Sequence, residues 1–429
     1  MFKKTKLEKV LSAWLKDGGS LQDKLPSGDD RVRTDAEARL VCAVLDRALS
    51  AAPIEPYSQS SNNLHAVVAL FQSVETDEAA ARLREQGLPR LRSLVRRYLQ
   101  EHHIDANMIM FVAKILAIYG DPKDISLIVS LAREPQCEEG YLWSTVFNEL
   151  ADHKENVSLV IEGLSNPLPQ QYCAIAFLDF CNQVAIAGLL AEHPFDSQDG
   201  RTRLRGWLSS ENAELTSYAV SATATLPFVE AGAAADLAAV AARHADMIVR
   251  IEGAWAEAKM GADSGLERLT IFARNPLYAA RAVRYLQELG HADRIPEEAR
   301  TPDARALAEM AQWLAHPNEF GRPPEEVSVA DTRELFWPPT NDRRRLWVIR
   351  YVYREDDGAL RPSYGLVGST TWAMMSEESR VEDPMDIYAI HCCWELEMNG
   401  DTSAPGERTV AAGRRILGQR NPDFSLRGV

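Results

Sequence analysis

The stretch MIVRIEGAWAEAKMGADSGLERL, from Met247 to Leu269, is the clearest indication of the fold in this sequence. Its first part contains several alanines, whose small side chains let two helices approach closely, and its last part contains leucines that can fill the seam between neighbouring helix pairs. Gly261 stands between the two parts and can adopt the left-handed conformation that ends a helix. Asp263 can then cap the helix that follows. The stretch therefore predicts two helices joined by a short turn.

This pattern resembles the HEAT and armadillo-type helical repeats. In such a repeat a Val-Arg pair stands near the start of the first helix, and a Gly-Asp-type turn precedes a second helix that carries leucines. The positions that match are Val249, Arg250, Ala254, Ala258, Gly261, Asp263, Leu266 and Leu269. The resemblance implies an α-solenoid of stacked helical hairpins over about half of the chain. An irregular helical domain without such stacking is the alternative.

A weak internal repeat supports the resemblance. The sequence ISLIV at residues 125–129 returns as VSLVI at residues 157–161, a lag of about 32 residues that falls within the range of helical-repeat periods. Each copy follows an apolar helical pattern and a short polar turn, at residues 120–122 in the first case and 152–154 in the second. Farther along the chain, MGADSGLERL is echoed by LGHADRIPEE.

These patterns divide the chain into four parts. Residues 1–103 are helical in pattern but lack the turn of the repeat, and we interpret them as an N-terminal helical cap, which a solenoid needs to cover its end hairpin. We assign residues 104–315 to the HEAT-like repeats. Residues 316–340 are rich in proline and are predicted to be a linker. Residues 341–429 are predicted to form a separate module, so the expected fold class is mainly α, an α-solenoid with a small C-terminal α+β module.

The β part of the C-terminal module rests on two segments. RLWVIRYVY, residues 345–353, is rich in β-branched and aromatic residues, which favour a strand. Asp357 and Gly358 form a hairpin-type turn sequence. YGLVGSTTWAMM, residues 364–375, is the expected partner strand.

Composition and charge narrow the class of protein. Of the 429 residues, 46% are hydrophobic and 25% are charged, which is the balance of a folded globular protein. The net charge of −15 argues against nucleic acid as a principal partner, because phosphate-binding surfaces are usually basic. No run approaches the roughly 20 apolar residues needed to span a bilayer. Six cysteines in so long a chain do not predict a disulfide framework.

The N-terminal segment MFKKTKLEKVLSAWLKDGG has apolar residues at helical spacing, and its charges interrupt any signal-peptide core. We expect a first helix that packs on the body of the protein. A basic amphipathic helix on an anionic membrane, as in a peripheral membrane adaptor, is the alternative. Because no export signal is visible, we expect a cytoplasmic protein that does not bind membranes.

The densest basic stretch is RLREQGLPRLRSLVRRYL, residues 82–99. On a helix, Arg92 and Arg96 share one face, and apolar residues form the other. We interpret Arg92, Arg96 and Arg97 as a candidate docking patch, either for an acidic partner or for the protein's own acidic surface. A solvated arginine face over a core stripe is the structural alternative.

The segment DPMDIYAIHCCWELEMNG, residues 383–400, contains a cluster of side chains that could carry chemistry: His391, Cys392, Cys393 and Glu395. The segment alternates well enough for a strand, but its Asp-Pro start matches the N-cap and the first position of a helix, so we favour a helix. Adjacent cysteines point about 100° apart on a helix and to opposite faces of a strand, so they do not readily share one metal ion.

We therefore predict that Cys392 and Cys393 are buried and reduced, and that His391 is hydrogen-bonded and not catalytic. No catalytic residue, cofactor or metal ion is predicted for the chain. The function we expect is that of a non-enzymatic scaffold or adaptor that binds protein partners through a helical-repeat surface, with the acidic balance favouring a partner of basic character. The alternative is an enzyme or small-ligand sensor with its site in the C-terminal module near His391.

Overall fold

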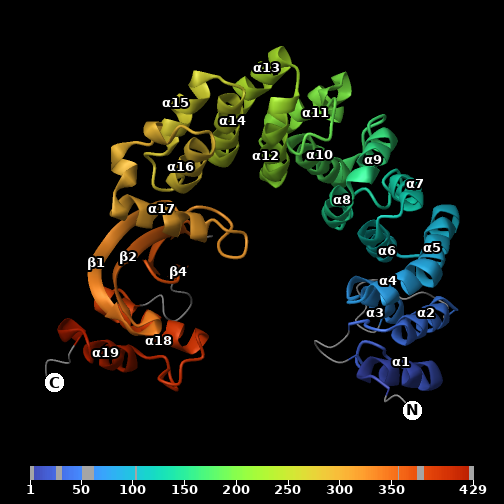
Figure 1. Cartoon of the computed structure of the whole chain (residues 1–429). Coiled ribbons are helices and arrows are strands. Elements are labelled where there is room, and N and C mark those ends of the chain that lie inside the picture. The colour runs from blue at the N-terminus through green and yellow to red at the C-terminus, as the bar shows by residue number, and fades with distance from the viewer. Residues whose placement is uncertain are drawn as a thin grey trace. The chain divides into compact units, whose positions relative to one another are not determined.

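The computed structural model describes residues 4–25, 31–50, 62–101, 104–355, 357–373 and 381–424. The chain forms two compact units, Met1–Val240 and Ala241–Val429 (Figure 1). It is mainly helical, and the second unit contains a four-stranded antiparallel sheet. This confirms the predicted mainly α chain with a small C-terminal α+β module. Among the described helices, none is long and apolar enough to cross a membrane.

The helices of the first unit are α1 (Lys6–Asp17), α2 (Asp35–Ser50), α3 (Asn63–Ala69), α4 (Asp77–Arg82), α5 (Leu88–Glu101), α6 (Ala106–Tyr119), α7 (Pro122–Leu131), α8 (Trp143–Ala151), α9 (Val157–Leu164), α10 (Gln171–Ile186), α11 (Gln198–Leu208), α12 (Thr216–Thr225) and α13 (Ala231–Ala241), which reaches the boundary. A π-helical turn, Leu83–Gly87, joins α4 to α5.

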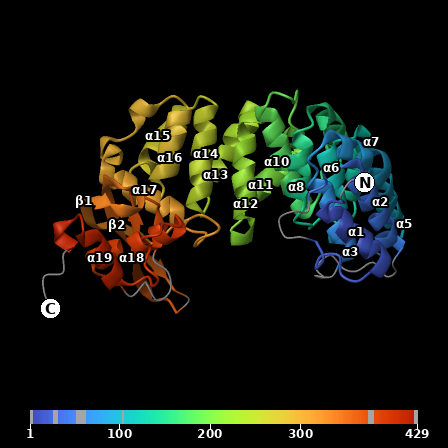
Figure 2. The same cartoon turned by 60° about the horizontal axis from the view of Figure 1, so that its bottom comes forward.

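The helices from α5 to α12 pack mainly against near neighbours in the sequence. Helices α6, α8, α10 and α12 contact one another in turn, and so do α5, α7 and α9. Both views show α6, α8 and α10 side by side in this order (Figures 1 and 2). The two similar sequences, ISLIV and VSLVI, lie in α7 and α9, which contact each other. The internal repeat of the sequence therefore corresponds to two neighbouring helix pairs, α6–α7 and α8–α9.

The turn between α6 and α7 has the predicted chemistry. Gly120 ends α6 in the left-handed conformation, with φ of 62°. The side chain of Asp121 accepts a hydrogen bond from the backbone N–H of Lys123, and Pro122 occupies the first position of α7. Proline is well suited to this position because its missing N–H would have no partner there. The predicted turn at residues 120–122 joins the end of α6 to the first residue of α7, and the one at residues 152–154 lies between α8 and α9.

Helix α1 packs on α2, as predicted for the N-terminal segment. Its apolar residues Leu7, Leu11 and Trp14 are buried. A capping box formed by Thr5 and Glu8 fixes its start. The face of α1 that could have bound a membrane is therefore largely occupied by the protein itself.

The second unit contains α14 (Met247–Lys259), α15 (Asp263–Phe272), α16 (Ala279–Glu288), α17 (Pro302–Leu314), β1 (Glu326–Trp337), β2 (Asp342–Arg354), β3 (Leu360–Val367), β4 (Trp372–Ala373), α18 (Pro384–Met398) and α19 (Val410–Gly418). The strands follow the order β1-β2-β3-β4 and every adjacent pair is antiparallel.

The Met247–Leu269 stretch forms two contacting helices, α14 and α15, and Gly261 has a φ of 88° between them. The expected role of Asp263 is wrong, because Asp263 is already the first residue of α15 and its carboxylate pairs with Arg294 at 2.9 Å. The echoed sequence LGHADRIPEE forms two 3-10 turns instead of a helix, because a proline interrupts it.

The predicted linker, residues 316–340, is corrected by the structure, since β1 lies within it. The polar residues of β1 face outward at alternate positions. Strand β1 pairs with β2, for example Val327 with Tyr351. The end of the predicted repeat region is also revised. Helix α17 packs on the sheet, where Met310 and Leu314 join one core with Ile349.

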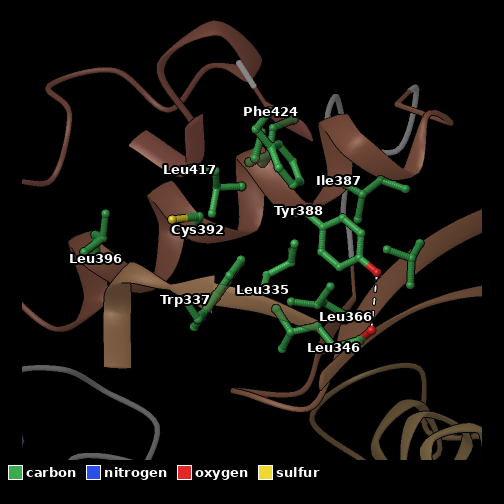
Figure 3. Packing of buried hydrophobic residues seen from close by; sticks show 13 residues of the cluster. Leu335, Trp337, Leu346, Leu366, Ile387, Tyr388, Cys392, Leu396, Leu417 and Phe424 are labelled. Carbon is green, nitrogen blue, oxygen red and sulfur yellow. Dashed lines mark hydrogen bonds between the residues drawn. The ribbon is translucent and has the colours of Figure 1, made fainter. Parts of the chain in front are cut away.

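The sheet lies between helices on both faces. Successive residues of β2 alternate: Leu346 and Val348 enter one core, whereas Ile349 and Tyr351 enter the core shared with α17. Helix α18 covers the first of these faces and contacts α19 on its other side. Figure 3 shows this core, in which the Tyr388 hydroxyl donates to the Leu346 carbonyl at 3.3 Å. The predicted helix over residues 383–400 is confirmed, and so is the pairing of β2 with the first part of the predicted partner strand. The partner strand predicted at residues 364–375 is not continuous: β3 already begins at Leu360, a turn at residues 368–371 separates it from β4, and residues 374 and 375 lie outside the described residues.

Candidate functional site

Helix α18 positions the cluster that the sequence singled out. The side chain of Asp383 caps its start by accepting from the N–H of Met385 at 2.9 Å, and Pro384 follows at the first position. His391 and Glu395 lie one turn apart on this helix. Their exposed fractions are 0% and 3%, so the structure brings these two residues together in the interior.

Glu395 accepts four hydrogen bonds from three parts of the second unit. Its Oε1 accepts from the backbone N–H of Thr370 at 2.7 Å and lies 3.3 Å from Nε2 of His391. Its Oε2 accepts from the Ser369 hydroxyl at 2.9 Å and from the Trp337 indole. Burial by itself would raise the pKa of Glu395, but these donors outweigh it and lower the pKa to about 2. The carboxylate therefore ties β1 and the β3–β4 turn to α18.

The imidazole of His391 is surrounded by indole rings. Its ring centroid lies 6.0 Å from that of Trp337, 5.6 Å from that of Trp372 and 5.3 Å from that of Trp394. Its Nδ1 is buried and finds no hydrogen-bond partner among the described residues. The contact of its Nε2 with Glu395 confirms that His391 is hydrogen-bonded, and the surrounding rings place the pair in the interior.

The side chains of the two cysteines lie in other surroundings than those of His391 and Glu395. Cys392 lies in the core of Figure 3, near Leu417 of α19, and the Sγ of Cys393 lies 3.9 Å from the carbonyl oxygen of Thr409. Both thiols are free and buried, which confirms the prediction, and burial raises the pKa of each. Within the ranges that the structure describes, no group of three His, Cys, Asp or Glu residues could hold a metal ion.

The three arginines of the candidate docking patch do not behave alike. The guanidinium of Arg92 binds Asp124 through Nε at 2.5 Å and Asp121 through Nη2 at 2.7 Å, and its side chain is 14% exposed. Arg92 therefore ties α5 to the start of α7, which corresponds to the alternative that the patch meets the protein's own acidic surface. The described residues provide neither an ion pair nor a hydrogen bond for Arg96 or Arg97.

Arg96 and Arg97 line an open groove between α2 and α5, which we call the arginine groove. Its volume is about 350 Å³. It is lined by Leu49, Arg90, Ser93, Leu94, Arg96, Arg97 and Gln100. The Nε of Arg97 is buried and has no hydrogen-bond partner in the described part of the chain.

A second surface, which the sequence analysis missed, combines aromatic rings from neighbouring helices. Tyr172 of α10 shares a hydrogen bond of 2.6 Å with Ser144 of α8. Trp207 of α11 and Tyr218 of α12 make an edge contact with ring centroids 5.8 Å apart. Burial and the nearby Tyr172 hydroxyl raise the pKa of Tyr218. We call Tyr172, Trp207 and Tyr218 the aromatic patch, and all three are half-buried. Their spacing follows no sequence period, so only the packing of the helices brings them together.

Comparisons of the chain with family models, with curated proteins and with solved structures found no match.

Proposed function

We propose that the protein is a non-enzymatic scaffold that binds protein partners through an α-solenoid of HEAT-like helical repeats. The helix pairs α6–α7 and α8–α9, with contacts between equivalent helices, support the repeat interpretation. Such an arrangement offers a continuous surface that crosses several pairs, and that surface can bind a protein without chemistry.

The main support for this proposal is the aromatic patch. It collects two tyrosines and a tryptophan from three consecutive helices on a half-buried surface, where Ser144 holds the Tyr172 hydroxyl at 2.6 Å. Tyr and Trp are enriched at protein interfaces because they contribute a large apolar area and a polar group while losing little side-chain entropy.

The alternative, an enzyme or small-ligand sensor near His391, has weaker support. A catalytic acid or base must come within hydrogen-bond reach of its substrate. His391 and Glu395 are buried and hydrogen-bonded to each other, and Glu395 already accepts from Trp337, Ser369 and Thr370. A substrate would have to displace this network to reach them.

Site-specific photo-crosslinking in the full-length chain tests the proposal. A photoreactive amino acid replaces Tyr218 in one variant and Ile186 in the control, which is 62% exposed and belongs to the neighbouring helix α10. We expect discrete crosslinked proteins from position 218 in the native cell that are not obtained from position 186. If the two positions give the same products, or position 218 gives none, the aromatic patch is not an interface and the proposal loses its main support.

A further inference from the structure

We propose that the arginine groove binds an acidic segment of a protein partner through its carboxylates. This inference rests on the proposed function and adds the chemistry of a ligand. It agrees with the sequence-based interpretation of Arg96 and Arg97 as a docking patch for an acidic partner. It differs from the basic partner that the net charge of −15 favours, because the groove is a local positive surface.

Two arginines near the groove are paired with acidic side chains, and two are not. Arg90 at one end of the groove is neutralised by Asp46, with Nε–Oδ1 and Nη2–Oδ2 distances of 2.5 and 2.8 Å. Arg92 is neutralised by Asp121 and Asp124. Arg96 and Arg97 receive no such partner from the described residues, and the nearby Asp124, which Arg96 influences only through space, is already bound to Arg92. Two guanidinium groups therefore remain available to an external anion.

The hydrogen-bond donors of the groove lie together on one face of α5. Ser93, Arg97 and Gln100 lie at positions i, i+4 and i+7 of α5, so they share one face of the helix, with Arg96 beside them. The Nε of Arg97 is buried without an acceptor, so an external carboxylate would bind the terminal nitrogens of this guanidinium, which are not buried. A guanidinium can hold a carboxylate with two parallel hydrogen bonds.

The lining and length of the groove suit a short acidic peptide. The half-buried Leu49 adds apolar area beside the charges, which suits a peptide that carries an apolar side chain among its acidic ones. Along α5 the groove runs from Arg90 to Gln100, a rise of about 15 Å, which corresponds to about four or five residues of extended peptide. A nucleic acid suits the groove less well, because the described residues that line it include no aromatic side chain for base stacking and the whole chain repels a polyanion.

Fluorescence anisotropy with the full-length protein tests this inference. The probe is a short labelled peptide of glutamates with one leucine, and the control probe replaces each glutamate with glutamine. We expect the glutamate peptide to bind with micromolar affinity and to weaken as salt is added. The double variant Arg96→Ala/Arg97→Ala should lose about tenfold or more in affinity, which corresponds to about 1.4 kcal/mol.

The matched control is the double variant Arg345→Ala/Arg415→Ala, which removes the same charge from two exposed arginines of the second unit. It should bind the peptide as the unmodified protein does. Circular dichroism should show that both double variants remain folded. Equal binding of the glutamine peptide, equal binding by Arg96→Ala/Arg97→Ala, or tighter binding of inorganic phosphate or a single-stranded oligonucleotide would overturn the inference.

The outcomes separate this inference from the proposed function. Crosslinks at position 218 without peptide binding would reject the arginine groove and leave the scaffold proposal standing. Arginine-dependent peptide binding without crosslinks at position 218 would support the groove and reject the aromatic patch.

Discussion

The Nδ2 of Asn156 donates a hydrogen bond of 2.9 Å to the carbonyl oxygen of Gly120, and this bond joins the turns of two successive helix pairs. The carbonyl belongs to the residue that ends α6, where the helix itself provides no partner. His153 adds a second link, with its Nε2 3.1 Å from the carbonyl oxygen of Ile118. Contacts between turns therefore fix the position of α8–α9 relative to α6–α7, in addition to the packing of apolar side chains.

Replacement of Asn156 by alanine should destabilise the first unit. Asn156 is fully buried, so its loss would leave the Gly120 carbonyl without a partner, at a cost of about 1–3 kcal/mol. Urea denaturation followed by circular dichroism measures the effect. Asn318→Ala, at an exposed position, is the control and should leave the free energy of unfolding unchanged within about 0.5 kcal/mol. Equal stability of the two variants would show that the turn contact contributes little.

Gly120→Ala should be more destabilising than Gly188→Ala. Both glycines have positive φ, 62° and 71°, so each substitution costs about 1–2 kcal/mol for the left-handed conformation. At Gly120 the new Cβ would also lie 2.3 Å from the ring of His153, whereas at Gly188 it would meet nothing within 4 Å. Thermal unfolding of the two variants measures the difference. A lower midpoint for Gly188→Ala than for Gly120→Ala would contradict the predicted contact between turns.

The features that were predicted correctly are those with local causes. Asp383 and Pro384 specify the start of α18 within two residues, and the β-branched and aromatic run of β2 specifies a strand by composition. Strand β1 was missed because its outward residues are polar and its pairing with β2 is a tertiary contact. Prolines nearby made the same segment resemble a linker.

The candidate sites depended on contacts that the sequence does not display. The acids that neutralise Arg92 lie about 30 residues farther along the chain. The sequence alone therefore could not show that Arg92 is ion-paired and that Arg96 is not. The i, i+4 spacing of His391 and Glu395 on a helix predicts that they are neighbours. The residues that donate to Glu395 come instead from distant strands and turns: Trp337, Ser369 and Thr370. The aromatic patch is likewise formed by tertiary packing alone.

The cysteines should be unreactive in the folded protein. Cys392 is 0% exposed and Cys393 is 1% exposed, and burial raises the pKa of both thiols, which lowers the fraction of reactive thiolate. A thiol reagent at mildly alkaline pH should label neither residue until urea is added. Ser403→Cys, at an exposed position, is the control and should react at once. Rapid labelling of Cys392 or Cys393 without denaturant would show that α18 opens, which would favour the enzyme or sensor alternative.

Glu395 should make the stability of the second unit depend on pH in the acidic range. Its pKa falls from 4.5 to about 2 on folding, a shift that corresponds to about 3 kcal/mol. Because the folded pKa is depressed, this contribution is fully present above about pH 4.5 and is lost as the pH falls towards 2. Glu395→Gln should therefore unfold at lower urea concentration than the unmodified protein at neutral pH, and the difference should shrink as the solution is acidified.

The control for this prediction is Glu397→Gln on the same helix. Glu397 is exposed, so its substitution should have little effect on unfolding at either pH. Tryptophan fluorescence is a suitable signal, because Trp337 donates to Glu395 and three indoles surround His391. Two results would contradict the proposed role of the carboxylate: a Glu395→Gln variant as stable as Glu397→Gln at neutral pH, or a stability loss that stays constant down to pH 2. Either result would mean that the four donors do not hold a charged Glu395, and that α18 is fixed on the sheet by apolar packing alone.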